Sequence, residues 1–177
     1  TVNKLDEIID EECTRILAKR QPAASDLRMI LSISKAVSEL ERMGDEAKKI
    51  AKFTLSLIEE GESPRGYVEI NRIGTMVSRM IHDALDATAR LDIDMAIKVA
   101  KQDRVVDMEY KTALRSLATY MMEDPRSITR ILNVIWVLRS LERIGDYARH
   151  VCQHLIYMIK GVDVRHVPAQ EIQQEIE

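Results

Sequence analysis

The sequence that decides the fold is Leu141-Glu142-Arg143-Ile144-Gly145-Asp146-Tyr147-Ala148, and it occurs a second time as Leu40-Glu41-Arg42-Met43-Gly44-Asp45-Glu46-Ala47. The two copies lie 101 residues apart and are identical at six of their eight positions. Repetition of this kind predicts an internal duplication, in which the two parts of the chain fold as similar units.

Each copy carries two carboxylates four residues apart, Glu142 with Asp146 and Glu41 with Asp45. On a helix, side chains with this spacing project from the same face. Apolar residues at intervals of three and four precede and follow each pair, so the acids interrupt a stripe that otherwise belongs in a core. Like charges are costly there unless a positive group joins them. The pattern therefore predicts either a bound metal ion or ion pairs with basic residues of the same helix, namely Arg42, Lys48, Arg143 and Arg149.

A further acidic pair, Asp103 and Asp107, interrupts an apolar stripe on the preceding predicted helix. Two such interruptions on adjacent antiparallel helices can face each other. We therefore expect four carboxylates around one spot, listed as Asp103, Asp107, Glu142 and Asp146. In the first half, Asn3 takes the place of one acid opposite Glu41 and Asp45, and the position four residues before Asn3 lies outside the chain. That second site is incomplete here.

The composition favours a helical, cytoplasmic protein. Of the 177 residues, 46% are hydrophobic and 31% charged, so a core can form beneath a well-solvated surface. The net charge of −3 gives no support to nucleic-acid binding, which uses a basic face. No apolar run approaches the roughly 18–20 residues of a membrane span, and no signal peptide is visible. The two cysteines form no recognisable motif, which indicates reduced, buried residues of a cytosolic protein.

Breaker residues divide the chain into five predicted helices, over residues 1–20, 25–60, 67–90, 94–122 and 125–160. We predict Ser25 and Asp92 as helix caps and Gly161 as a helix end. The cluster at 61–66 sets a domain boundary, which gives units 1–62 and 63–177. The second unit is a three-helix bundle with a weakly ordered tail. The first holds only two helices, and we expect a preceding helix in the full-length protein. The predicted fold is all-α, a tandem repeat of two three-helix bundles.

Several segments resemble the PhoU family of phosphate-transport regulators. They are the two Glu-Arg-x-Gly-Asp copies and residues 10–13, 20–28, 120–125 and 162–166, so the resemblance covers nearly the whole chain. It implies two similar three-helix bundles whose acidic motifs pair to hold metal, with iron, zinc, magnesium or manganese as the candidates. By matching motif, one site comprises Asp103, Asp107, Glu142 and Asp146, and the remains of the other comprise Asn3, Glu41 and Asp45.

The resemblance also implies a function. The family is non-enzymatic and represses phosphate uptake and the phosphate-starvation response, as an adaptor between the ATPase subunit of the phosphate ABC transporter and a membrane sensor histidine kinase. We accordingly expect a homodimer that reaches the membrane only through its partners. The residues agree, because they include no nucleophile–base pair and no phosphate-binding Gly-rich loop.

Two other classes of protein remain as alternatives. A di-iron carboxylate enzyme needs Glu-x-x-His motifs, and no glutamate here is followed by histidine three residues later. A histidine phosphotransfer module needs an exposed histidine on a bundle face, and the two halves repeat none. His150, four residues after Asp146, is a further possible metal ligand. We expect His82, His154 and His166 to be surface or packing residues, and Trp136 and the nine methionines to lie in the core or at an interface.

Overall fold

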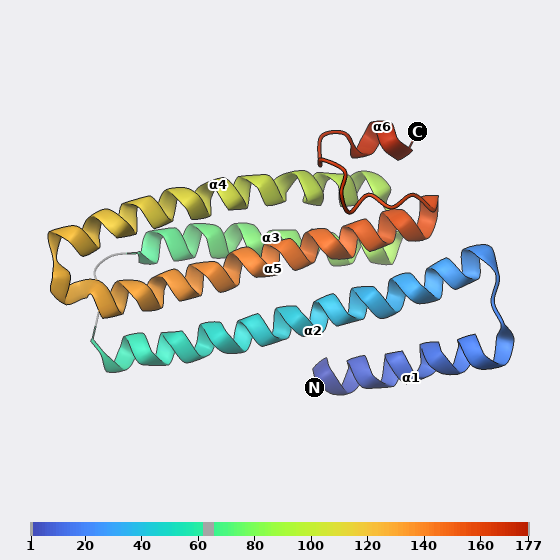
Figure 1. Ribbon diagram of the computed structural model, residues 1–177, viewed down its shortest axis with the longest axis horizontal. Coiled ribbons are helices and arrows are strands. Elements are labelled where there is room, and N and C mark those ends of the chain that lie inside the picture. Colours follow the sequence, from blue (N-terminus) through green and yellow to red (C-terminus); the bar gives the residue numbers. More distant parts are fainter. Residues whose placement is uncertain (1, 62–65, 177) are drawn as a thin grey trace.

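The computed structural model describes residues 2–61 and 66–176, and these form helices and their connections without any strand (Figure 1). The elements are α1 (Val2–Arg20), α2 (Ala24–Glu59), α3 (Tyr67–Arg90), α4 (Ile93–Glu123), the 3-10 turn η1 (Pro125–Ser127), α5 (Ile128–Lys160) and α6 (Ile172–Ile176). The all-α prediction is confirmed, and the five predicted helices correspond to α1 to α5 with small shifts at their ends.

Two of the three predicted helix ends are confirmed. The Asp92 side chain accepts a hydrogen bond of 2.9 Å from the backbone N–H of Met95, which caps α4. Gly161 closes α5 with a left-handed φ of 75° that suits glycine. The predicted cap at Ser25 is wrong. The carbonyl of Ala23 already accepts from the backbone N–H of Asp26 at 3.1 Å, so α2 begins earlier and Ser25 lies inside its first turn.

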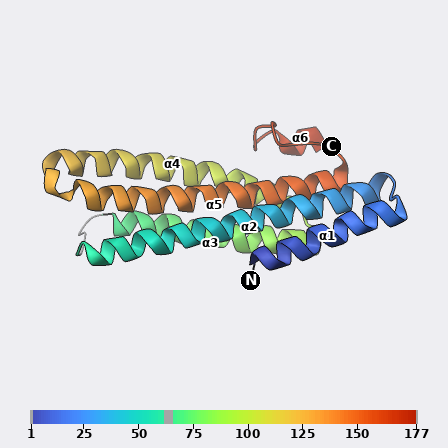
Figure 2. The same ribbon diagram turned by 60° about the horizontal axis from the view of Figure 1, so that its bottom comes forward.

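Helices α3, α4 and α5 pack against one another as an up-down-up bundle, which is the three-helix unit predicted for the second half (Figures 1 and 2). Helix α2 runs antiparallel to α5 along the side of α5 that the bundle leaves open. Helix α1 packs on α2. The first half thus contributes the two helices that its sequence predicted, and the proposed boundary between residues 62 and 63 lies outside the described residues.

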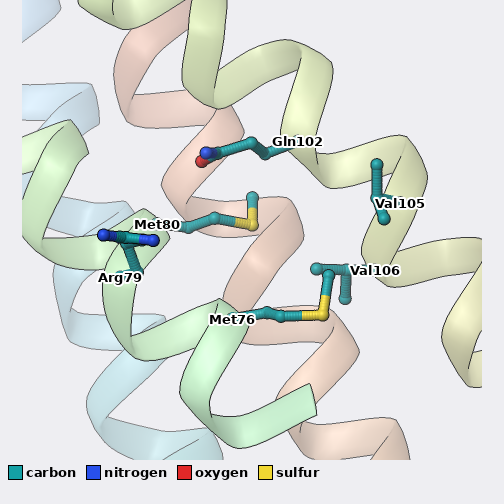
Figure 3. Close-up of a pocket in the computed structure, with 6 residues that line it drawn as sticks. All are labelled: Met76, Arg79, Met80, Gln102, Val105 and Val106. Atoms are coloured by element: carbon teal, nitrogen blue, oxygen red, sulfur yellow. The ribbon is translucent and has the colours of Figure 1, made fainter. Parts of the chain in front are cut away.

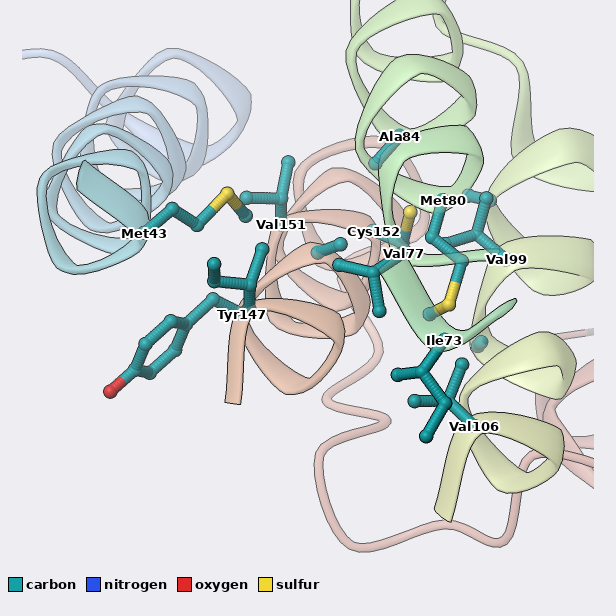
Figure 4. Packing of buried hydrophobic residues seen from close by; sticks show 14 of the residues in the cluster. Met43, Ile73, Val77, Met80, Ala84, Val99, Val106, Tyr147, Val151 and Cys152 are labelled. Atoms are coloured by element: carbon teal, nitrogen blue, oxygen red, sulfur yellow. The ribbon is translucent and has the colours of Figure 1, made fainter. Parts of the chain in front are cut away.

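Helix α5 is the centre of the molecule, with apolar contacts on two sides (Figure 4). Met43 of α2 faces Val151 and Tyr147 of α5, while the opposite side of α5 meets the buried residues of α3 and α4. Cys152 is fully buried in this core, and burial raises the pKa of its thiol to about 12. A thiol of this kind is unreactive, and both cysteines are free and buried as predicted.

The tail after α5 is packed, which makes the prediction of a weakly ordered tail wrong. Val164, Ile172 and Ile176 are buried against the bundle, because burial of three apolar side chains offsets the entropy of ordering a short segment. The single tryptophan does not lie in the core, because Trp136 is 52% exposed; its ring stacks on Phe53 of α2 at a centroid distance of 6.2 Å. No helix among the described residues is long and apolar enough to cross a membrane.

Candidate functional site

Helices α4 and α5 bring the four predicted carboxylates of the second half into one region. Asp103 and Asp107 lie one turn apart on α4, and Glu142 and Asp146 lie one turn apart on the neighbouring α5. Asp103 is 7% exposed and Glu142 is 9% exposed, so the acids do interrupt the core as their spacing predicted. Buried carboxylates need a positive partner.

Arg149 supplies that partner. Its Nε lies 2.7 Å from Oδ2 of Asp103 in an ion pair without hydrogen-bond alignment, and its Nη2 donates to Oδ1 of Asp146 at 3.0 Å. Arg149 therefore bridges the acids of two helices. A second arginine, Arg139, donates from Nη1 to Oε1 of Glu142 at 2.7 Å. An ion pair with a basic residue of the same helix, which was one of the two predictions, is thus observed for Asp146. Arg139, the partner of Glu142, was not among the predicted basic residues.

The arginines do not fully offset the negative charge. Burial raises the pKa of Asp103 from 3.8 to about 6 against the opposing pull of Arg149, and Asp146 and Asp107 raise it further. Burial and the charge of Asp146 also raise the pKa of Asp107 and that of Glu142. Because the charge of Asp146 raises the pKa of each of the other three acids, all three lie within electrostatic reach of Asp146. At neutral pH the cluster therefore keeps negative charge that the arginines do not compensate.

Gly145 lies where α5 approaches α4. A Cβ atom added there would stand 3.7 Å from Oδ1 of Asp103 and 3.7 Å from Cγ1 of Val106, which are ordinary contacts. Gly44, the equivalent residue in the first copy, would bring a Cβ within 4.0 Å of the Val2 side chain only. Neither position requires glycine for space beside the acidic pair.

The first-half acids occupy a different environment. Asn3 donates from Nδ2 to Oε1 of Glu41 at 2.9 Å, which confirms that Asn3 faces the motif across α1 and α2. Asp45 accepts from Nζ of Lys48 at 2.8 Å, and its side chain is 48% exposed. Lys48 lowers the pKa of Asp45, whereas the pKa values of Asp103, Asp107 and Glu142 in the second half are raised. These two carboxylates are already hydrogen-bonded, so they need a cation less than the second-half cluster does.

The second-half acids fit a hard cation in chemistry, since carboxylate oxygens are the ligands that Mg²⁺, Mn²⁺ and Ca²⁺ prefer. Oε2 of Glu142 is buried and has no hydrogen-bond partner among the described residues. Across the described ranges, however, no three His, Cys, Asp or Glu side chains converge in a group that could hold a metal. Arg149 bridges Asp103 and Asp146 where a cation would join them. A metal would have to displace that side chain, and metal binding stays a prediction.

A second polar cluster, which the sequence analysis missed, joins α2 to α5. Oε2 of Glu39 lies 3.6 Å from Nδ1 of His150, and its Oε1 lies 3.8 Å from Nε2 of His154. Glu39 and His154 are both buried. Burial alone would raise the pKa of Glu39, but the neighbouring imidazoles of His150 and His154 lower it to about 2. His150 thus faces Glu39, and His154 serves packing and pairing inside the molecule.

The interface between α2 and α5, called the seam below, also contains Glu46 of α2, which is buried between two cations. Its Oε1 lies 2.9 Å from Nζ of Lys49 and 3.2 Å from Nε of Arg143 on α5. Arg143 also donates to the Tyr147 hydroxyl at 2.8 Å. The sequence did contain a signal for this seam: Glu39, Met43 and Glu46 follow the helical intervals of four and three. That signal does not reveal which helix the face meets.

A cavity of about 170 Å³ opens between α3 and α4 (Figure 3). Its lining is mostly apolar and consists of Met76, Arg79, Met80, Gln102, Val105 and Val106. Oε1 of Gln102 is buried without a hydrogen-bond partner among the described residues. None of the predicted metal ligands lines this cavity.

Comparison with known proteins decides the family. The model of the PhoU domain matches residues 1–54 and 70–155, which together form most of the chain. The chain belongs to the PhoU family. It is 60% identical over 176 residues to the phosphate-specific transport system accessory protein PhoU homolog of Pseudomonas aeruginosa, covering 99% of this chain and 73% of that protein. It is 46% identical over 171 residues to PhoU of Escherichia coli K12, covering 97% of this chain and 70% of that protein.

Solved PhoU structures share the fold. A crystal structure of PhoU from Pseudomonas aeruginosa superimposes with a TM-score of 0.89 at 62% identity, over 91% of this chain and 77% of that one. A PhoU regulatory protein from Streptococcus pneumoniae gives a TM-score of 0.83 at 31% identity, over 92% and 76%. These relatives carry the names of accessory and regulatory proteins rather than enzymes, in agreement with the prediction of a non-enzymatic PhoU-family protein.

Proposed function

We propose that this PhoU-family protein is a negative regulator of phosphate uptake and of the phosphate-starvation response. The observation that carries the proposal is its identity with named accessory proteins of phosphate-specific transport over almost its whole length. It acts as a cytoplasmic homodimer and as an adaptor between the ATPase subunit of the phosphate transporter and a sensor histidine kinase. It reaches the membrane only through these partners.

The first half presents a broad apolar surface that is available to a partner or to a further helix. Helices α1 and α2 expose many large apolar side chains, and surfaces of this kind mark protein contacts. The exposed residues are Val2, Leu5, Ile8, Leu27, Met29, Leu31, Ile33, Leu55 and Ile58. Docking of a partner there would remove this apolar surface from water.

The second-half acids hold a hard cation in this proposal, with Asp103 and Asp107 contributed by α4 and Glu142 and Asp146 by α5. Magnesium, manganese and iron suit the oxygen ligands better than zinc, which favours nitrogen and sulfur. A bound cation would supply the positive charge that the raised pKa values call for. The four carboxylates come from two helices of the bundle, so binding of the cation would fix α4 relative to α5. Asn3, Glu41 and Asp45 form the weaker, incomplete counterpart.

Gene deletion tests the regulatory role. In the host bacterium, loss of the protein is expected to switch on phosphate-starvation genes in medium rich in phosphate. Reintroduction of the wild-type gene restores repression, and normal repression in the deletion strain would defeat the assignment. A gene with both Glu142 and Asp146 changed to Ala separates the two parts of the proposal, because full complementation by it would remove the cation from the mechanism but keep the adaptor.

Thermal melting tests the cation site directly. A ligand at 100 times its Kd stabilises a protein by about 2.7 kcal/mol, so millimolar Mn²⁺ should raise the melting temperature relative to chelator. Asp146→Ala should abolish most of that rise. Asp94→Ala is the matched control, because it removes an exposed aspartate of α4 that lies outside both predicted sites. Equal melting curves of the wild type in Mn²⁺ and in chelator would contradict the site, and elemental analysis of protein purified without chelator identifies the metal.

A further inference from the structure

Two segments that carry the family resemblance, residues 24–28 and 162–166, have no part in the carboxylate site. The structure brings them together where the N-terminal half of α2 runs beside the C-terminal half of α5 (Figure 1). The guanidinium carbon of Arg28 lies 3.5 Å from the point that a Cβ of Gly161 would occupy. Gly161 leads directly into the tail segment, so the start of α2 and the end of α5 meet there.

A cavity of about 240 Å³ lies at this junction. It is lined by Lys35 of α2, by Gln153, His154 and Tyr157 of α5, and by Asp163 and Arg165 of the tail. Three separate parts of the chain therefore contribute polar or charged side chains to one space. It shares no lining residue with the predicted carboxylate site.

The charge of this cavity favours an anion. Its one carboxylate, Asp163, already accepts from Nε of Arg165 at 2.9 Å, and this hydrogen bond lowers the pKa of Asp163 well below its usual range. Lys35 forms no ion pair with any residue that the structure describes. With Asp163 and Arg165 neutralising each other, the lysine leaves the cavity positive. A lysine ammonium is a common partner for phosphate-type oxygens.

One residue that lines the cavity, Gln153, carries a buried polar atom without a partner. Gln153 is 3% exposed, and its Oε1 has no hydrogen-bond partner within the described part of the chain. Ser32 Oγ and Arg28 Nε are also buried without a hydrogen-bond partner among the described residues. Both residues precede Lys35 along one face of α2. A buried polar atom left unpaired costs roughly 1–3 kcal/mol, so such atoms are normally satisfied by protein, water or ligand. An acceptor such as Oε1 of Gln153 calls for a ligand that also carries a donor.

We propose that the α2–α5–tail cavity is a binding site for a small oxyanion of the phosphate class that retains a proton at neutral pH, as free orthophosphate does. Its oxygens accept from Lys35, and its P–O–H donates to Oε1 of Gln153. Sulfate is fully deprotonated at neutral pH and offers no such donor. The site thus discriminates between two anions of similar size and shape.

Titration calorimetry in phosphate-free buffer with chelator tests the proposal, because chelator prevents phosphate from binding through a metal. The probes are sodium orthophosphate, adenosine 5′-monophosphate and sodium sulfate. Orthophosphate should bind more tightly than sulfate, and more tightly than adenosine 5′-monophosphate, whose phosphate group is largely a dianion without a P–O–H at neutral pH. Absence of orthophosphate binding at millimolar concentration, or equal affinity for sulfate, would overturn the proposal.

Variants on α2 locate the site. Lys35→Gln should weaken orthophosphate binding by ~10-fold or more, which is the effect of losing one charge-assisted hydrogen bond. Lys52→Gln is the matched control, since Lys52 is also an exposed lysine of α2 but lies outside the cavity. Both changes are at the surface and preserve the core. An equal loss of affinity in the two variants would show diffuse attraction to surface charge and overturn the site. The measurement uses the isolated protein, so its outcome is independent of the proposed regulatory role.

Discussion

Asp103→Asn is expected to stabilise the metal-free protein at neutral pH. The pKa of Asp103 is raised by burial from 3.8 to about 6, despite the ion pair with Arg149. A raised carboxyl pKa means that the folded state binds the proton more tightly than the unfolded state. The stability that protonation provides is therefore complete below pH 3.8 and is lost as the pH rises through about 6.

The size of the effect follows from the same two values. One pH unit of pKa difference corresponds to about 1.4 kcal/mol, so ionisation of Asp103 in the folded state costs on the order of 3 kcal/mol at pH 7.5. Asparagine occupies a similar volume and carries no charge. In chelator at pH 7.5, Asp103→Asn should therefore raise the free energy of unfolding by ~1–3 kcal/mol, with the lower figure reflecting the lost ion pair to Arg149.

Urea unfolding at pH 5.5 and pH 7.5, followed by circular dichroism in chelator, measures this directly. The wild type should be more stable at pH 5.5, and the difference should shrink in Asp103→Asn. Asp94→Asn, an exposed aspartate at the start of α4, is the control and should keep the wild-type difference. Destabilisation of Asp103→Asn at pH 7.5, or an unchanged difference between the two pH values, would refute the assignment of raised pKa to charge burial.

Three further substitutions probe the seam and the glycines. Because His150 and His154 hold the pKa of Glu39 at about 2, the stability that Glu39 contributes is lost as the pH falls from 4.5 toward 2. Glu39→Gln should remove that loss of stability at low pH, as measured by acid unfolding followed by fluorescence. Identical acid-unfolding curves for the variant and the wild type would contradict the pairing of Glu39 with the two histidines. Gly145→Ala should raise the free energy of unfolding by up to ~1 kcal/mol through helix propensity, and with it the melting temperature. Gly66→Ala should lower it, since its φ is +95° and a Cβ would stand 2.5 Å from Val134; the reverse order would refute both.

Much of the carboxylate site could be predicted from spacing alone. Glu142 and Asp146 lie four residues apart within a duplicated motif, and Asp103 and Asp107 show the same interval on the preceding helix. Helical periodicity is a local property, so it places each pair on one face of its own helix. The short connection between α4 and α5 makes the two helices antiparallel neighbours, which lets the two faces meet.

The identity of the counter-charge could not be predicted in the same way. Arg139, Arg143 and Arg149 all lie within one turn of an acid on α5, and spacing allows each of them to pair with Glu142 or Asp146. In the structure Arg149 reaches across to Asp103, Arg139 takes Glu142, and Arg143 instead meets Glu46 of α2. Long side chains choose among several partners according to what the neighbouring helix presents, and that information is not local.

The sequence by itself determined the number, length and character of the helices, the internal duplication and the family. These depend on periodicity, breakers and motifs, which are properties of neighbouring residues. Only the tertiary structure decided that α2 lies along α5, that Glu39 and Glu46 are buried there, and that the tail joins α2 and α5 around a cavity. Each of these features joins residues about 100 or more positions apart, and such contacts are set by how whole helix faces fit together.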